Sequence, residues 1–290
     1  MLTLKSTLAK RLFYGTLMIF VLVALFVGEG YDASHRLLLK APHYQGFYFC
    51  TIIALFACLG ARELFSMSLS KGWQGSLAIT AIAICIIVTH GYWFNGNVML
   101  LLSGLLLIAS LYHGINHGTQ ETFGALGQSC FITIYLGVGC YFMGQIRGLG
   151  IGEATTWGQI KYVVMFTTVV KSADIGAFFV GRSFGKHKWV PSISPGKTWE
   201  GFFGGVSLAM IVTFLFACGM HIIWYKALVF GVAVGIIGPL GDLLESMLKR
   251  DAGSKDSAQL VPAFGGMMDL LDSPIIAAPV AYCLLHYWII

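Results

Sequence analysis

The sequence predicts an all-α, polytopic integral membrane protein with about nine transmembrane helices. Hydrophobic residues make up 57% of its 290 positions and charged residues only 11%, and the mean hydropathy is +0.78. Soluble domains carry roughly 25% charged residues, so composition alone argues against a soluble fold. The apolar residues also gather in runs near the roughly 20 residues that a helix needs to cross a bilayer.

Nine apolar runs occur along the chain. They cover residues 12–28, 44–61, 76–94, 98–112, 123–143, 162–180, 202–223, 227–244 and 267–290. The first run has a basic flank, as a secretory signal has. It lacks a convincing small-residue cleavage site and eight runs follow it, so we expect a retained helix.

Lysine and arginine indicate which side of the membrane each loop faces, because they concentrate in cytoplasmic loops. With nine spans and an inside N-terminus, the inside segments hold twelve of these residues and the outside segments five, while Lys171 lies within a span. This bias predicts that the N-terminus is inside and the C-terminus outside.

Acidic residues concentrate toward the C-terminus. Eight of the thirteen lie between positions 174 and 272: Asp174, Glu200, Asp242, Glu245, Asp251, Asp256, Asp269 and Asp272. Ionisable groups in or beside a span are costly, which favours a functional site or an ion path. Within a single membrane domain, we therefore expect a transmembrane scaffold at residues 1–160 and a catalytic transmembrane region at residues 161–290.

The segment GDLLESMLKRD ends the eighth run. On a helix, Asp242, Glu245, Ser246 and Lys249 form one polar stripe at i, i+3, i+4 and i+7. The alternative is an amphipathic helix end entering water, with Lys249 and Arg250 balancing the helix dipole. Because Asp242 lies a full turn deeper than a solvated end requires, we favour a functional stripe.

The segment MMDLLDSP opens the ninth run. A helix that began at Ser273 and Pro274 would span only about 24 Å, short of the roughly 30 Å core. A helix that begins after residues 265–266 would span about 36 Å and contain Pro274 as a kink. Asp269 and Asp272 would then share one face and offer the oxygen ligands that Mg²⁺ requires. The alternative is a polar helix start capped through Ser273.

Cations gather in the segment VGRSFGKHKWVPSISPGKTWEGFFGG, which we expect on the cytoplasmic side. It supplies Arg182, Lys186, Lys188 and Lys197 among glycines and hydroxyl groups. An ordinary positive-inside loop would carry similar charge. Glycine permits close backbone approach to phosphate and the hydroxyls add donors, which favours an anion site.

Two patterns in the chain are ambiguous. Gly-Lys-Thr at 196–198 ends like a Walker A loop, but the required first glycine is replaced by Pro191, which has no N–H to donate. Lys171 and Asp174 stand at i, i+3 within a span and fit either an internal ion pair or a ligand role.

A third pattern is a possible metal face. His113, His117 and Glu121 have the i, i+4, i+8 spacing of ligands on one side of a helix. Gly114 and Gly118 interrupt the stretch, so we favour a polar turn.

Paired carboxylates beside a basic loop suit phosphoryl or nucleotidyl transfer. The blocks SADIGAFFVGRSFGKHK, SPGKTWEGFFGG and GDLLESMLKRDAGSKDSAQLVPAFGGMMDLLDS resemble, in order, the C-terminal signature of the phosphatidate cytidylyltransferases, also called CDP-diacylglycerol synthases. The resemblance covers about residues 171–274. Before residue 171 it lies only in hydropathy.

The resemblance implies that CTP and phosphatidic acid react to give CDP-diacylglycerol and pyrophosphate, with Mg²⁺ required and room for a second cation. It implies that Asp242 and Asp269 hold metal, beside Asp272, and that Lys249 and Lys197 contact phosphate. The catalytic set is thus Asp242, Asp269 and Lys249. The expected substrate-binding residues are Lys197, Ser194, Thr198, Arg182, Arg250, Lys255, Asp256 and Asp174.

The same resemblance implies a homodimer in a bacterial inner membrane, surrounded by membrane lipid, with the active site facing the cytoplasm and no nucleic-acid partner. One block departs from the family pattern P-G-H-G-G-x-x-D-R-x-D. Ala263, Phe264 and Leu270 replace its glycine, histidine and arginine. We expect an active enzyme with an altered site. The alternatives are a CTP-dependent polyprenol or phytol kinase and a non-catalytic paralogue or transporter.

Overall fold

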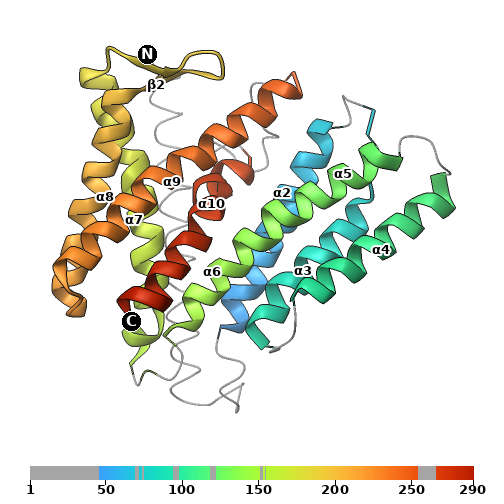
Figure 1. Cartoon of the computed structure of the whole chain (residues 1–290), viewed down its shortest axis with the longest axis horizontal. Coiled ribbons are helices and arrows are strands. Elements are labelled where there is room, and N and C mark those ends of the chain that lie inside the picture. Colours follow the sequence, from blue (N-terminus) through green and yellow to red (C-terminus); the bar gives the residue numbers. More distant parts are fainter. Residues whose placement is uncertain are drawn as a thin grey trace, which may run out of the picture.

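The computed structural model describes residues 46–68, 72–73, 75–93, 98–117, 122–150, 153, 155–253 and 266–290. These residues form a bundle of long helices with one short hairpin (Figure 1). The first helices are α2 (Phe47–Ser68), α3 (Leu77–Trp93), α4 (Val98–His117), α5 (Thr122–Ile132) and α6 (Gly139–Gly148), with a π-helical turn at Thr133–Val138 between α5 and α6. The remaining elements are α7 (Thr156–Phe184), β1 (Lys188–Val190), β2 (Ser194–Thr198), α8 (Trp199–Met220), α9 (Trp224–Asp251) and α10 (Met268–Leu284), which a π-helical turn extends.

The all-α membrane class is confirmed. Six of the described helical segments are long and apolar enough to cross a membrane: Tyr48–Ser68, Thr122–Gly148, Trp157–Phe184, Trp199–Met220, Trp224–Asp251 and Met268–Ile289. Leu77–His90 is a shorter apolar helix. The first predicted span, at residues 12–28, lies outside the described residues, so the total of nine stays a prediction.

Two expectations about helix ends have different outcomes. The last helix begins at Met268 and contains Pro274, as its required length predicted. The polar turn expected at His113 and His117 is wrong there, because α4 continues to His117. A glycine inside a helix costs only about 1 kcal/mol, which the long apolar helix accommodates at Gly114. Glu121 lies outside the described residues.

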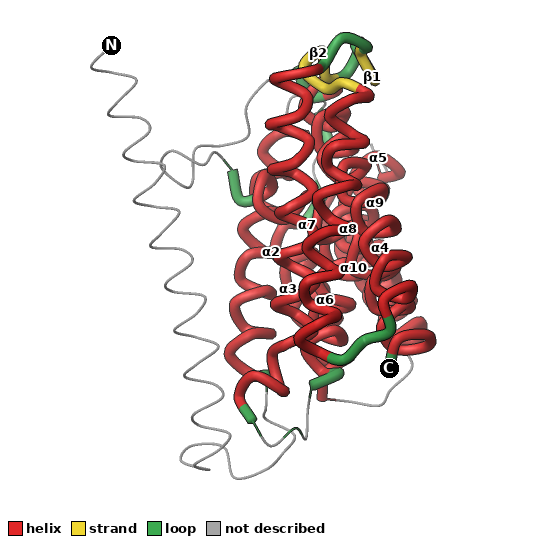
Figure 2. Tube along the Cα trace, turned by 90° about the vertical axis from the view of Figure 1, so that its left-hand side faces the viewer, coloured by secondary structure: helices red, strands yellow, loops and turns green. Residues whose placement is uncertain are grey.

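Close backbone contacts hold the C-terminal helices together. A Cβ added at Gly201 of α8 would lie 2.8 Å from the Ala177 carbonyl oxygen of α7, and one added at Gly205 would lie 2.6 Å from that of Ala173. Small residues four apart let helix backbones approach closely in a membrane. α7 and α8 therefore pack against each other directly beneath the hairpin that connects them (Figure 2).

The hairpin lies at the end of the bundle opposite the C-terminus (Figure 1). Its strands are antiparallel and pair Lys188 with Thr198. Arg250, at the end of α9, donates a hydrogen bond from Nε to the Ile193 carbonyl at 3.3 Å. The hairpin is thus tied to α9 as well as to the two helices that it connects.

Candidate active site

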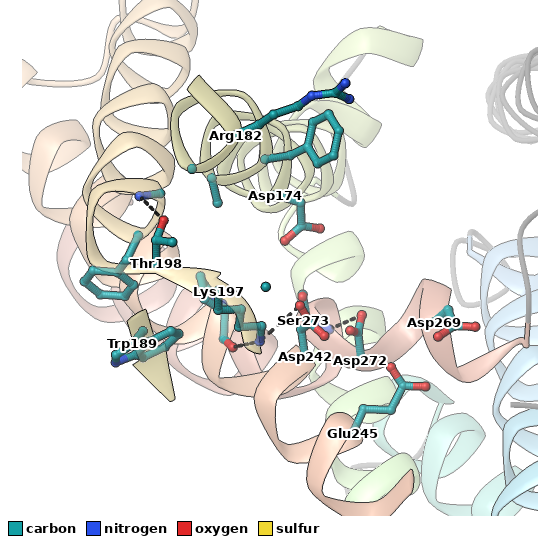
Figure 3. Close-up of a pocket in the computed structure, with 17 residues that line it drawn as sticks. Asp174, Arg182, Trp189, Lys197, Thr198, Asp242, Glu245, Asp269, Asp272 and Ser273 are labelled. Carbon is teal, nitrogen blue, oxygen red and sulfur yellow. Dashed lines mark hydrogen bonds and ion pairs between the residues drawn. The ribbon is translucent and has the colours of Figure 1, made fainter. Parts of the chain in front are cut away.

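A cavity of about 580 Å³ opens among α7, α8, α9, α10 and the hairpin (Figure 3). All of its lining residues lie between positions 174 and 273. Its polar wall consists of Asp174, Arg182, Lys197, Thr198, Asp242, Glu245, Asp269, Asp272 and Ser273. The cavity therefore combines acidic, basic and hydroxyl groups in the region where the acidic residues concentrate in the sequence.

Three carboxylates form the centre of the cavity. Asp242, Glu245 and Asp272 each offer an oxygen, and these oxygens lie within 4.8 Å of one another. Glu245 is only 3% exposed and Asp272 only 5%. Carboxylates this close repel one another, and a cation between them would relieve the repulsion. Oxygen donors of this kind suit Mg²⁺, so the three residues fit a divalent-cation site.

A close helix crossing brings the carboxylates together. Asp242 and Glu245 lie one turn apart on α9, whereas Asp272 comes from α10. Next to Asp242, a Cβ at Gly241 would lie 2.2 Å from the Asp272 carbonyl oxygen. The absence of a side chain at Gly241 therefore allows the two helices to meet at the cluster.

Two lysines flank this cluster. Lys197, from the hairpin, places Nζ 3.1 Å from Asp242 Oδ2 and donates to the Pro239 carbonyl at 3.2 Å. Lys249, on α9, places Nζ 3.0 Å from Glu245 Oε1 and 2.5 Å from Asp269 Oδ1. Lys197 lines the cavity, so phosphate oxygens that entered it could reach this lysine, whereas Lys249 is not a lining residue and contacts the lining residues Glu245 and Asp269.

Asp269 lies apart from the three clustered carboxylates (Figure 3). Besides its contact with Lys249, it accepts a hydrogen bond through Oδ2 from the Gly266 amide at 2.7 Å. The structure thus brings together two of the three predicted metal residues, Asp242 and Asp272, and adds Glu245. The i, i+3 spacing of Glu245 from Asp242 was the available signal for it.

Three more predicted binding residues line the cavity. Arg182 lies over the Phe178 ring, 6.0 Å from its centroid. Asp174 Oδ2 lies 3.2 Å from Lys171 Nζ. The internal ion pair, which was one of the two predictions for these residues, is therefore present. Thr198 accepts a hydrogen bond from the Gly201 amide at 3.1 Å and so caps α8.

Two predicted binding residues lie outside the cavity lining, and two fall outside the part of the chain that the structure describes. Ser194 lies on β2 opposite Val190, and it is not among the residues that line the cavity. Arg250 is also outside the lining, where it binds the hairpin backbone. Lys255 and Asp256 lie outside the described residues.

The Gly-Lys-Thr motif does not form a phosphate loop. Residues 196–198 end strand β2, and Thr198 is the N-cap of α8. Lys197 extends from this strand end to Asp242. The motif therefore positions a lysine beside the carboxylate cluster.

Comparisons with known proteins find similarity along most of the chain. A model of the cytidylyltransferase family matches residues 33–288. The chain is 35% identical over 259 residues to a phosphatidate cytidylyltransferase of Bacillus subtilis, which covers 85% of this chain and 89% of that protein. It is 30% identical over 238 residues to one of Staphylococcus epidermidis, covering 80% and 87%. With one of Haemophilus influenzae it shares 44% identity over 119 residues, covering 38% and 41%.

Proposed function

Because the chain belongs to the cytidylyltransferase family, we propose that it transfers the cytidylyl group of CTP to phosphatidic acid, giving CDP-diacylglycerol and pyrophosphate. In this reaction a phosphate oxygen of the lipid attacks the α-phosphorus of CTP, and pyrophosphate leaves. The observation that carries the proposal is the carboxylate cluster, two of whose three members are buried, between two lysines. Phosphoryl chemistry depends mainly on positioning phosphates and neutralising charge, which these groups can do.

Mg²⁺ is the cofactor in this proposal. Asp242, Glu245 and Asp272 would hold it, since their oxygens lie within 4.8 Å of one another. A bound Mg²⁺ would neutralise the charge that develops on the phosphate oxygens. When CTP binds, Lys249 would contact a phosphate oxygen of CTP in place of Asp269. Asp269 would then bind the same Mg²⁺ or a second cation.

The basic groups orient the substrates. Lys197 would bind the triphosphate from the hairpin side of the carboxylates. The start of α8, which Thr198 caps, also lines the cavity, and a helix N-terminus attracts anions. Arg182 is exposed and lines the cavity, which suits it to the phosphate of the lipid acceptor.

The placement of the protein follows from the substrates. We propose a bacterial inner membrane with the hairpin end on the cytoplasmic side, where CTP is available. The excess of lysine and arginine predicted for that side supports this orientation. Phosphatidic acid would come from the surrounding bilayer. We also propose a homodimer, which cross-linking in native membranes followed by mass measurement in detergent would test.

Of the three variant residues, only Leu270 lies in the part of the chain that the structure describes. Leu270, at the position of the family arginine, is partly buried and packs against the hydrophobic core. Ala263 and Phe264 lie outside the described residues. The carboxylates and lysines described above remain in place, so we propose an active enzyme rather than a non-catalytic paralogue.

The test uses protein purified in detergent with radiolabelled CTP, phosphatidic acid and Mg²⁺. We expect CDP-diacylglycerol and pyrophosphate from the native protein, and neither from Asp272→Asn or Asp269→Asn. Glu153→Gln is a matched control, because Glu153 is exposed and pairs with Lys161 outside the cavity. Release of CDP with phosphorylation of a lipid alcohol would instead indicate a kinase. Equal activity in all four proteins would refute the site assignment.

A further inference from the structure

A buried carboxylate from the N-terminal half caps the helix that carries Asp269 and Asp272. Glu63 of α2 is only 1% exposed. Its Oε1 accepts a hydrogen bond from the Met267 amide at 2.7 Å, and its Oε2 accepts one from the Met268 amide at 3.0 Å. Both oxygens are therefore engaged by the first residues of a helix about two hundred positions away in the sequence.

Amide groups at the start of a helix have no partner within that helix, and the helix dipole favours negative charge there. At the start of α10, three consecutive amides have carboxylate acceptors. Gly266 donates to Asp269, while Met267 and Met268 donate to Glu63. The first turn of α10 is thus fixed by its own aspartate and by a glutamate from α2.

The same part of α2 also packs closely against Met268. A Cβ added at Gly60, one turn before Glu63, would lie 3.0 Å from the Met268 sulfur. Met268 itself is completely buried. Glu63 and Gly60 together therefore restrict both the position of α10 along its axis and its rotation.

This restriction acts on the proposed active site. Asp269 directly follows Met268, and Asp272 comes one turn later. Asp269 contacts Lys249, and Asp272 joins Asp242 and Glu245 in the carboxylate cluster. A change in the rotation of α10 would move both aspartates relative to α9. Glu63 does not line the cavity, and its two hydrogen bonds reach the site through the start of α10.

We propose that Glu63 is a positioning residue for the cation site: its two hydrogen bonds hold α10 at the register where Asp272 meets Asp242 and Glu245. The activity measurement that tests this proposal rests on the function proposed above. The measurement of cation binding does not depend on that function. It assigns part of the site to α2, in the region where the sequence predicted only scaffold.

The test compares Glu63→Gln and Glu63→Asp with the native protein in detergent. Glutamine keeps the size of the side chain, but it places an NH₂ group against one of the two amides and removes the charge. We expect Glu63→Gln to raise the Mg²⁺ concentration for half-maximal activity about tenfold, as loss of a group that orients ligands typically does. Mn²⁺ affinity, measured by electron paramagnetic resonance without substrates, should fall by a similar factor. Glu63→Asp, which keeps the charge, should recover part of both.

Ile53→Ala is the control, because Ile53 is a buried core residue of α2 that lies about 15 Å from Glu63 along this helix. It should lower the melting temperature and leave the Mg²⁺ requirement and Mn²⁺ affinity unchanged. A Glu63→Gln protein that resembles this control, less stable but with native cation binding, would overturn the proposal.

If Glu63→Gln does not fold, Gly60→Ala takes its place. The added methyl would press on Met268, and we expect a two- to threefold weaker Mn²⁺ affinity; an unchanged affinity would count against the proposal.

A native protein that binds Mn²⁺ but makes no CDP-diacylglycerol would refute the proposed function alone, and the Mn²⁺ comparison would still decide the role of Glu63. A native protein without Mn²⁺ binding would overturn the positioning role.

Discussion

Gly241 of α9 lies directly against the backbone of Asp272 in α10: a Cβ on this glycine would be 2.2 Å from the Asp272 carbonyl oxygen. This contact lies within the site, because Asp242 directly follows Gly241 and shares the carboxylate cluster with Asp272. The crossing of two helix backbones thus determines the distance between the carboxylates.

Gly241→Ala should separate α9 from α10 and open the cluster. A displacement near 1 Å in a catalytic site reduces activity on the order of 100-fold. Overpacking should also destabilise the protein by about 1–3 kcal/mol. Initial rates of CDP-diacylglycerol formation and thermal melting in detergent would measure both effects.

Gly104→Ala is the matched control for this substitution, since Gly104 lies in α4 and an added Cβ there meets no atom within 4 Å. It should leave the rate near that of the native protein. If Gly241→Ala behaved in the same way, the close crossing would not be what sets the cluster geometry.

Lys197→Ala should weaken CTP binding. Lys197 lies beside Asp242, and a hydrogen bond to a charged group contributes about 1.5–3 kcal/mol, which corresponds to a rise in KM for CTP of roughly 10- to 100-fold. The KM for phosphatidic acid should change much less. Lys161→Ala removes a lysine whose partner is Glu153 and should leave both constants unchanged. A rise confined to phosphatidic acid would show that Lys197 binds the lipid instead.

Divalent cations should stabilise the folded protein. A ligand that binds only the native state stabilises it by about 2.7 kcal/mol at 100 times its Kd. Mg²⁺ should therefore raise the melting temperature in detergent, and a chelator should reverse the rise. Asp272→Asn removes one carboxylate of the cluster and should abolish this response. An equal response in the variant would place the cation elsewhere.

Leu270→Arg restores the arginine of the family pattern, but we do not expect it to raise activity. Leu270 is partly buried against the hydrophobic core, and moving a charge into apolar surroundings is costly. The variant should melt at a lower temperature, whereas Leu270→Met, which conserves volume, should cost less than about 1.5 kcal/mol. Faster turnover with unchanged melting would show that the arginine position faces the substrates in this protein.

Local properties of the sequence determined the class of fold and the start of α10. The length of an apolar run decides whether a helix can span a bilayer, so residues 227–244 and 202–223 predicted α9 and α8 without knowledge of their neighbours. The same length argument placed Pro274 inside α10. The i, i+3 spacings placed Asp242 with Glu245 on one helix and Asp269 with Asp272 on another.

Contacts between distant segments decided the rest. Periodicity within one helix cannot tell which of two aspartates will face a neighbouring helix, because that depends on how closely the backbones approach at Gly241. Lys249 and the Gly266 amide hold Asp269, and Glu245 lies with Asp242 and Asp272. The arrival of Glu63 at the start of α10 depends in turn on the packing of α2. The sequence by itself determined the helices and the residue types of the site, and tertiary packing decided which of them meet.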